Sequence, residues 1–274
     1  LLTGVYGFIG ANFAIYWNNH YPDDRIIGID KMTYAANPAN LDSIVRHANM
    51  TCYRGDIADA AFVQSVFEKE RPQWVVNFAA ESHVDRSINH PELFIHSNVL
   101  GVSVLMDACL RFGVNRFHQV STDEVYGDLP LESTSAFTEE SALHPSSPYA
   151  ASKASADLLV LSYARTYGLP VTISRCSNNY GRFQHREKLI PKVVDCAHRG
   201  VSIPVYGRGD NRRDWIHVDD HCTAIDYILH KGKENHIYNV SAHEEINNLE
   251  LIRKILAILG KSDDLITFVN DRPG

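Results

Sequence analysis

Strand-like runs and helical patterns alternate along most of this chain, and this alternation limits its fold more than any other feature. Trp74 to Ala80 (WVVNFAA) is a continuous apolar run, which is typical of a parallel strand buried on both faces. Strands are expected at 25–30, 51–55, 74–80, 116–121 and 171–176, and helices at 59–71, 92–112 and 148–167. The alternation predicts an α/β fold with a doubly wound parallel sheet of the Rossmann type.

A glycine-rich turn opens the chain and leads into a helix that ends near Asn19. Gly4, Gly7 and Gly10 are spaced three residues apart, which lets the backbone turn tightly and approach a pyrophosphate at the helix N-terminus. Asp30 ends the next expected strand, twenty residues after Gly10. A carboxylate there accepts hydrogen bonds from a ribose 2′-hydroxyl and repels a 2′-phosphate, so NAD is expected rather than NADP. The neighbouring Lys31 leaves NADP open.

After about residue 175 the alternation is less regular. Short strands are expected at 203–207 and 236–240, with helices from 188, at 219–230 and at 248–259. We expect residues 1–174 to form an NAD-binding domain, with parts of 210–238 returning to it. Residues 175–274 are expected to form mainly a smaller C-terminal substrate-binding lobe, truncated at its end, and the abrupt start at Leu1 indicates a trimmed amino end.

A tyrosine and a lysine share one face of the expected helix at 148–167. Tyr149 and Lys153 are separated by one helical turn. A lysine ammonium at that distance stabilises a phenolate and lowers its pKa from about 10. Such a phenol can take a proton from a sugar hydroxyl while hydride leaves the same carbon. The spacing alone is common on surface helices, so the rest of the site has to support it.

A threonine and two carboxyls follow the expected strand at 116–121. Thr122, Asp123 and Glu124 would therefore lie at the carboxyl edge of the sheet, where ligands bind in open α/β folds. Two neighbouring carboxyls in one pocket do not both ionise readily, so one protonated and one ionised group are expected. Removal of water needs this combination. With Tyr149 and Lys153 these residues form the expected catalytic set.

Composition excludes several classes of protein. The chain has 274 residues, a net charge of −7 and no basic block, so neither nucleic acid nor an anionic membrane is an expected partner. No apolar run approaches the ~20 residues that a membrane-spanning helix needs. Five scattered cysteines without a C-x-x-C pair indicate reduced thiols in a cytoplasmic protein. The fourteen histidines lack a metal-ligand spacing, so no metal is expected.

Seven motifs occur in order along the chain: AAESHVDRS (79–87), STDEVYG (121–127), SSPYAASKAS (146–155), CSNNYG (176–181), EKLIP (187–191), RDW (213–215) and DRPG (271–274). With these motifs the chain resembles the extended short-chain dehydrogenase/reductase (NAD-dependent epimerase/dehydratase) family over nearly its whole length. Within that family it is most similar to the dTDP-glucose 4,6-dehydratases. Sugar epimerases of the family share the glycine turn and the Tyr/Lys pair but typically lack the Asp-Glu step.

The resemblance implies a reaction in three steps. Tyr149, helped by Lys153 and Thr122, would deprotonate the 4-hydroxyl of dTDP-glucose while hydride passes from C4 to NAD. Glu124 would remove the C5 proton, and Asp123 would protonate the departing 6-hydroxyl. Hydride return to C6 gives dTDP-4-keto-6-deoxy-glucose for deoxysugar (rhamnose-type) biosynthesis and regenerates NAD.

The resemblance also implies binding residues and an assembly. Cofactor contacts are expected from Gly4, Gly7, Phe8, Ile9, Gly10, Asp30, Lys31, Met32, Thr33, Asp56, Ile57, Phe78, Ala79, Ala80, Glu81, Ser82, Ser97, Tyr149, Lys153 and Asn179. Substrate contacts are expected from Ser82, Thr122, Asn178, Lys188, Leu189, Pro204, Tyr206, Arg213 and Asn248. Family members pair through helices that match 92–112 and 148–167, so a homodimer is expected.

Three positions depart from the family pattern. Val5 replaces the usual second glycine and would crowd the turn if its φ were positive. Ser97 stands where threonine is common, and the chain stops at Gly274, before a segment that closes on the nucleotide in the family. Three alternatives stay open: a UDP-glucose 4,6-dehydratase, a nucleotide-sugar 4-epimerase that needs no Asp123 or Glu124, and a non-catalytic NAD-binding regulator.

Overall fold

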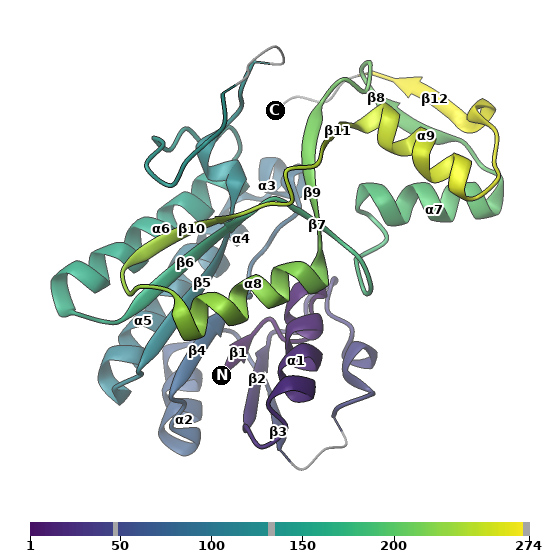
Figure 1. The fold of residues 1–274 in the computed structure, drawn as a ribbon. Helices are drawn as coiled ribbons and strands as arrows, with labels where there is room; N and C mark the ends of the chain where they lie inside the picture. The colour runs from purple at the N-terminus through teal and green to yellow at the C-terminus, as the bar shows by residue number, and fades with distance from the viewer. Residues whose placement is uncertain (46–48, 131–134, 271–274) are drawn as a thin grey trace.

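The structure is a computed structural model that describes residues 1–45, 49–130 and 135–270. The DRPG motif at 271–274 lies outside the described residues. The main element is a seven-stranded sheet in the order β10-β6-β5-β4-β1-β2-β3, and each of its strand pairs is parallel (Figure 1). Its strands are β1 (Leu2–Thr3), β2 (Ile26–Asp30), β3 (Met50–Arg54), β4 (Trp74–Asn77), β5 (Arg116–Thr122), β6 (Val171–Cys176) and β10 (His236–Val240). The expected doubly wound parallel sheet is confirmed.

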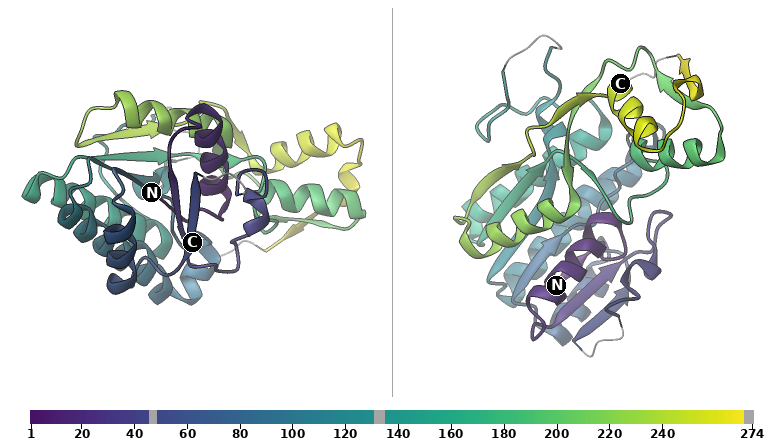
Figure 2. Two further views of the ribbon diagram at one scale, coloured as in Figure 1. Left: turned by 90° about the horizontal axis from the view of Figure 1, so that it is seen from below. Right: turned by 45° about the vertical axis from the view of Figure 1, so that its right-hand side comes forward.

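Helices cover both faces of this sheet (Figures 1 and 2). One face carries α1 (Phe8–His20) and α8 (Val218–Lys231), and the other carries α2 (Ala60–Glu70), α5 (Gly101–Phe112) and α6 (Pro148–Tyr167). Neighbouring side chains on a strand point to opposite faces, so Val75 packs into the core beneath α2, α5 and α6 while Val76 packs beneath α1 and α8. This burial on both faces is why the strands read as continuous apolar runs.

A switch in strand order lies between β1 and β4. The chain runs from β1 outward through β2 to β3, and then returns to β4 and runs outward the other way through β5 to β6. The loops after β1 and β4 therefore diverge above the carboxyl ends of these strands. In doubly wound sheets the crevice at such a point is where ligands bind.

The smaller lobe has a core of its own. It consists of α7 (Leu189–Arg199), β8 (Ile203–Tyr206), α9 (Asn248–Ile258), the short helix η4 (Asp263–Leu265) and β12 (Ile266–Val269). Val193, Ile203 and Leu256 are buried at its centre. A three-stranded sheet, β11-β9-β7, joins this lobe to the main sheet through β7 (Asn178–Tyr180), β9 (Arg212–His217) and β11 (Glu245–Asn247).

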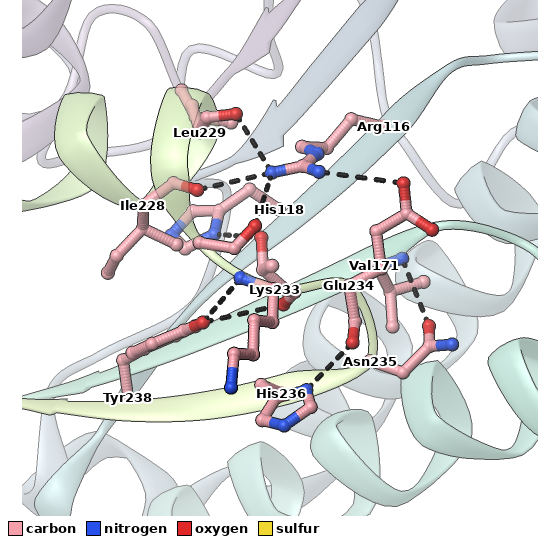
Figure 3. A network of polar contacts seen from close by, with 12 residues as sticks. Arg116, His118, Val171, Ile228, Leu229, Lys233, Glu234, Asn235, His236 and Tyr238 are labelled. Atoms are coloured by element: carbon pink, nitrogen blue, oxygen red, sulfur yellow. Dashed lines mark hydrogen bonds and ion pairs between the residues drawn. The ribbon is translucent and has the colours of Figure 1, made fainter.

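Arg116 at the start of β5 ties α8 to the sheet (Figure 3). Its guanidinium donates at 2.8–3.2 Å to three carbonyls at the end of that helix, those of Ile228, Leu229 and Gly232. The last carbonyls of a helix have no partner within it, and a cation there also interacts favourably with the helix dipole. Arg116 therefore holds the chain in the position from which β10 joins the edge of the sheet.

Two expectations need correction. The strand expected at 74–80 ends at Asn77, because the Ala79 backbone N–H donates to the Thr3 hydroxyl (3.1 Å) instead of joining the sheet. The helical segment Pro91–Phe112 is long and apolar enough to span a membrane by length and composition, contrary to the sequence estimate. It packs against α2 and α6, and 44% of its most apolar window is buried.

That segment is also not a uniform α-helix. It consists of α4 (Pro91–Phe94), a π-helical stretch η2 (Ile95–Leu100) and α5. The remaining short helices are η1 (Pro38–Leu41), α3 (Val84–Asn89) and η3 (Asp123–Tyr126). Because π-helical turns are rare and concentrate at functional sites, η2 draws attention to the residues that it carries.

Candidate active site

The expected cofactor residues gather at the carboxyl edge of the sheet. They follow β1, β2, β3 and β4, with Ser97 in η2, Tyr149 and Lys153 in α6, and Asn179 in β7. Since all strands of the main sheet are parallel, these strand ends share one edge. The structure thus brings residues from seven separate segments to the crevice.

The glycine turn packs so tightly that side chains are excluded from it. Gly4 has φ +63°, and a Cβ there would lie 2.8 Å from the Ala79 nitrogen, while a Cβ on Gly10 would lie 2.3 Å from the Gly4 oxygen. Val5 does not have a positive φ, and its side chain is fully buried in the core beneath α1, so it does not crowd the turn. No side chain caps α1 at Gly7, so its first N–H groups are available for a pyrophosphate.

Acidic side chains at the ends of β2 and β3 shape the adenosine end of the crevice. The Asp30 carboxylate accepts hydrogen bonds from the backbone nitrogens of Tyr6 (2.9 Å) and Met32 (2.7 Å). These bonds oppose the burial that raises its pKa. Asp56 forms an ion pair with Lys31 at 2.6 Å. Burial works against it, but Lys31 and further hydrogen bonds lower the pKa of Asp56, so this carboxylate stays ionised.

The segment after β4 is held by a residue that was not among the predicted site residues. Asn98 in η2 accepts a hydrogen bond from the Glu81 nitrogen (2.8 Å) and donates to the Glu81 oxygen (3.0 Å). It also donates to the Ser152 hydroxyl (2.9 Å). Asn98 is buried and thus links the cofactor loop to the catalytic helix α6. A single amide inside an apolar helical pattern was the available signal.

The two carboxyls after β5 lie in the first turn of η3. Thr122 caps this helix by accepting a hydrogen bond from the Glu124 nitrogen (3.3 Å), and it donates to Asp123 (3.4 Å). Burial, followed by the charge of Glu124, raises the pKa of Asp123 to about 7. Asp123 is therefore about half protonated at neutral pH and largely protonated below it. The protonated state is the one that a general acid requires.

Asp123→Asn should stabilise the folded protein above about pH 8 and change little near pH 4. The pKa of Asp123 is raised from 3.8 to about 7, so across that window the folded state holds a proton that the unfolded state has lost. Stability consequently falls as pH rises through the window, and an amide removes this cost. We expect a gain of about 4 kcal/mol at the higher pH, or roughly 8–16 °C in Tm. Thermal unfolding at both pH values tests this, and equal shifts at both would contradict it.

Tyr149 and Lys153 lie where expected, but their protonation is not as expected. Ser147 caps α6 by accepting a hydrogen bond from the Ala150 nitrogen, which places Tyr149 in the first turn. Burial and the charge of Glu124 raise the pKa of Tyr149 well above its usual value, against a hydrogen bond with Thr122. The Lys153 ammonium donates a hydrogen bond to the Val120 carbonyl oxygen (2.7 Å), so its charge is not directed at the Tyr149 phenol alone. Burial of both groups opposes the expected lowering of the phenol pKa by Lys153.

A buried ion pair lies close to Lys153 and affects its charge. Arg175 in β6 donates to Asp157 at 2.9 Å, and both side chains are almost wholly buried. Burial lowers the pKa of Lys153, whereas the charge of Asp157, one turn further along α6, opposes that shift. Arg175 also donates to the Tyr126 hydroxyl (2.9 Å). Breaking such a pair would leave an uncompensated buried charge. The network therefore keeps Asp157 in place one turn from Lys153.

Asn179 is held by a second buried residue that was not predicted. The His221 Nδ1 lies 2.8 Å from the Asn179 side-chain oxygen. Burial lowers the pKa of His221 to about 4, so the ring is neutral, and its Nδ1–H donates to Asn179. The Asn179 nitrogen in turn donates to the Ser177 oxygen (3.0 Å). The amide is thereby fixed in one orientation.

The expected substrate residues fall into two groups. Arg213 on β9 acts electrostatically on Asp123, and Lys188 donates to the Ser82 oxygen (3.2 Å), so both belong to the sheet edge. Four others, with Asn178 on the connecting strand β7, lie farther out in the smaller lobe, on α7, β8 and α9: Leu189, Pro204, Tyr206 and Asn248. Among the described residues no group of His, Cys, Asp and Glu is placed to hold a metal ion.

A doubly wound sheet with a glycine turn after β1, and a tyrosine, a lysine and a threonine meeting at its edge, defines an enzyme of the extended short-chain dehydrogenase/reductase class. The family described as GDP-mannose 4,6 dehydratase matches residues 1–270, and the chain belongs to this family. The resemblance drawn from the motifs is confirmed.

Individual relatives agree with this assignment. The chain is 46% identical over 274 residues to a low-salt glycan biosynthesis protein of Haloferax volcanii, covering 100% of this chain and 86% of that protein. It is 43% identical over 294 residues to the dTDP-glucose 4,6-dehydratase of Haemophilus influenzae, covering 100% and 86%.

Solved structures show the same fold. The dTDP-glucose 4,6-dehydratase DesIV of Streptomyces venezuelae, with NAD and TYD bound, matches with a TM-score of 0.94 and 43% identity, over 99% of this chain and 84% of that one. The UDP-glucose 4-epimerase of Thermotoga maritima, solved with UDP-glucose, matches with a TM-score of 0.90 but 26% identity, over 100% and 86%.

Proposed function

We propose that this protein is a hydro-lyase that converts dTDP-glucose to dTDP-4-keto-6-deoxy-glucose in an NAD-dependent reaction. The observation that carries the proposal is the pair of adjacent carboxyls beside Tyr149, in which Asp123 has a pKa raised to about 7. An epimerase needs no such acid and base pair. Relatives named dTDP-glucose 4,6-dehydratase at 43–44% identity support the nucleotide and sugar.

The protein's own groups divide the work. Tyr149 and Thr122 bind the 4-hydroxyl and take its proton, with Lys153 supplying positive charge to the same region. Glu124 takes the C5 proton, which the 4-keto group makes acidic, and Asp123 gives its proton to the departing 6-hydroxyl. NAD, when bound, accepts hydride from C4 and returns it to C6, and its positive ring favours an ionised Tyr149.

The residues of the crevice fit NAD. The uncapped N-terminus of α1 suits the pyrophosphate, Asp30 suits a ribose diol, and Asn179 offers an oriented amide. Solved neighbours from Streptomyces venezuelae and Bacillus anthracis contain NAD. We assign residues 1–174 with the 210–238 return to cofactor binding, and the lobe from 175 to substrate binding.

We also propose a homodimer in the cytoplasm. Apolar side chains are exposed on adjoining helical segments, at Leu93 (40%), Ile95 (59%) and Leu158 (58%). Such a surface on α4, η2 and α6 suits association with a second copy. All five cysteines are free, as in a reducing compartment. Sedimentation equilibrium should give twice the chain mass, and a monomer at all concentrations would contradict the dimer.

Incubation of the full-length protein with dTDP-glucose in deuterated water, without added NAD, tests the function. We expect a 4-keto-6-deoxy sugar that carries solvent deuterium at C5, read by mass and proton NMR. A galactose-configured sugar with no loss of water would identify an epimerase instead. Equal or faster turnover of UDP-glucose would reassign the nucleotide, and no reaction even with added NAD would contradict catalysis of this kind.

A further inference from the structure

Three segments meet above the glycine turn. Tyr34 lies in the loop after β2, His83 and Arg86 lie at and within α3 after β4, and Glu187 lies just before α7. In the sheet β1 lies between β2 and β4, so contacts between their loops pass over the turn that follows β1. We call these four side chains the Glu187 latch.

Glu187 is the centre of the latch. Its Oε1 accepts a hydrogen bond from the Tyr34 hydroxyl at 2.9 Å, and its Oε2 lies 3.6 Å from the His83 Nε2. His185 Nδ1 lies 3.5 Å from the same carboxylate. Burial is the main cause that raises the pKa of Tyr34, to about 12, so its hydroxyl remains a donor. One carboxylate therefore joins the loops after β2 and β4 to the entry of the smaller lobe.

Two further contacts complete the crossing. The Arg86 guanidinium lies over the Tyr34 ring at 4.1 Å from its centroid, and Arg86 pairs with Glu81 at 3.6 Å. Lys188, next to Glu187, donates to the Ser82 oxygen. Residues 81–82 belong to the expected cofactor loop. The latch and the neighbouring Lys188 therefore contact residues that are expected to line the crevice.

The latch is partly open to solvent, which suits a contact that opens and closes. The Tyr34 residue is 44% exposed, and the Glu187 and His83 side chains are 23% and 21% exposed. Ion pairs in such positions are individually weak because water screens them. They can break without unfolding the domain, yet several together slow the separation of three segments.

We propose that Glu187 is a positioning residue that retains NAD, because its contacts with Tyr34 and His83 close the crevice over the glycine turn. This inference rests on the proposed use of NAD. A cofactor that takes hydride from C4 and returns it to C6 has to stay until the second transfer, and release in between would strand the keto intermediate. A latch that does not touch the reacting atoms would serve this purpose.

Cofactor exchange in the full-length protein tests the proposal without any sugar substrate. Protein loaded with NAD is mixed with an excess of fluorescent etheno-NAD, and the exchange rate is followed. For Glu187→Ala we expect NAD release to be about tenfold faster, and for Tyr34→Phe about threefold faster, as loss of partly exposed hydrogen bonds would give. The double variant should release NAD no faster than Glu187→Ala, since both changes remove one shared bond.

Tyr16→Phe is the matched control. Tyr16 donates to Asp226 at 2.8 Å between α1 and α8, so the change removes a similar tyrosine–carboxylate bond away from the latch. Its release rate should equal that of the wild type. If Glu187→Ala does not fold, Tyr34→Phe still tests the bond, because the ring and its contact with Arg86 remain.

Two outcomes would overturn the inference in distinguishable ways. If the wild type binds NAD and all variants release it at the wild-type rate, the latch does not retain NAD. The proposed function would then still stand. Wild-type protein that binds neither NAD nor etheno-NAD would overturn the proposed function and the latch with it.

Discussion

Glu124→Gln should stop the reaction after oxidation at C4. The amide is close in shape to the carboxylate but cannot accept the C5 proton, so formation of the 6-deoxy product should fall by about 10²–10⁴-fold. The charge of Glu124 raises the pKa of both Asp123 and Tyr149. Its removal therefore makes ionisation of Tyr149 easier, and the C4 oxidation should proceed. Rapid mixing with dTDP-glucose should show reduced nicotinamide that accumulates and persists.

Isotope exchange gives an independent reading of the same variant. Sugar recovered from deuterated water should carry no deuterium at C5, because the group that removes this proton is absent. Glu92→Gln is a suitable control, since that side chain is 68% exposed on α4 and pairs only loosely with His90. Product formed by Glu124→Gln at the wild-type rate would show that another group is the base.

The fold was largely predictable because its determinants are local. Strands buried on both faces carry a continuous apolar signal, and a parallel sheet then places all their polar ends at one edge. The strand boundary after Asn77 was missed because it depends on Thr3, far away in sequence. The Thr3 hydroxyl donates to the Asn77 side chain and accepts from the Ala79 nitrogen, which turns the chain out of the sheet.

Residues that support the site were harder to predict than residues that carry the chemistry. Asn98, Asp157 and His221 act through partners that are distant in the sequence, among them Ser152, Arg175 and Asn179. A polar residue inside an apolar helix is as often a surface residue, so only the tertiary arrangement separates the two cases. Protonation states were equally hard to predict from the sequence, since the pKa of Tyr149 depends on burial and on the charge of Glu124.

The raised pKa of Asp123 accounts for its role as the acid of the two adjacent carboxyls. Burial disfavours charge at Asp123, and a second negative charge next to it adds to that effect. Arg213 and Thr122 act the other way, which keeps the pKa near neutrality instead of far above it. Asp123 can therefore lose its proton to a departing hydroxyl and regain it in each cycle.

Tyr149→Phe should stop the reaction at its first step. Phenylalanine cannot take the 4-hydroxyl proton, and neither the Thr122 hydroxyl nor the Lys153 ammonium is a base that replaces it. The ring still fills the buried space beside Phe94, with which Tyr149 makes an edge-on contact. We expect turnover to fall by about 10³-fold or more while the protein still folds and binds NAD. Rapid mixing with substrate should give no reduced nicotinamide, in contrast to Glu124→Gln.

The two variants together separate the steps, because the C5 proton becomes acidic only after C4 is oxidised. Tyr149→Phe should consequently show no deuterium at C5, although Glu124 is intact. Tyr163→Phe on the same helix removes a hydroxyl that donates to Asp107 at 2.6 Å, and it should leave the reaction unchanged. If Tyr149→Phe still reduced NAD on addition of substrate, the proton acceptor would have to be another residue. The order of events would nevertheless remain, because loss of the C5 proton without prior oxidation would leave a carbanion that no neighbouring carbonyl stabilises.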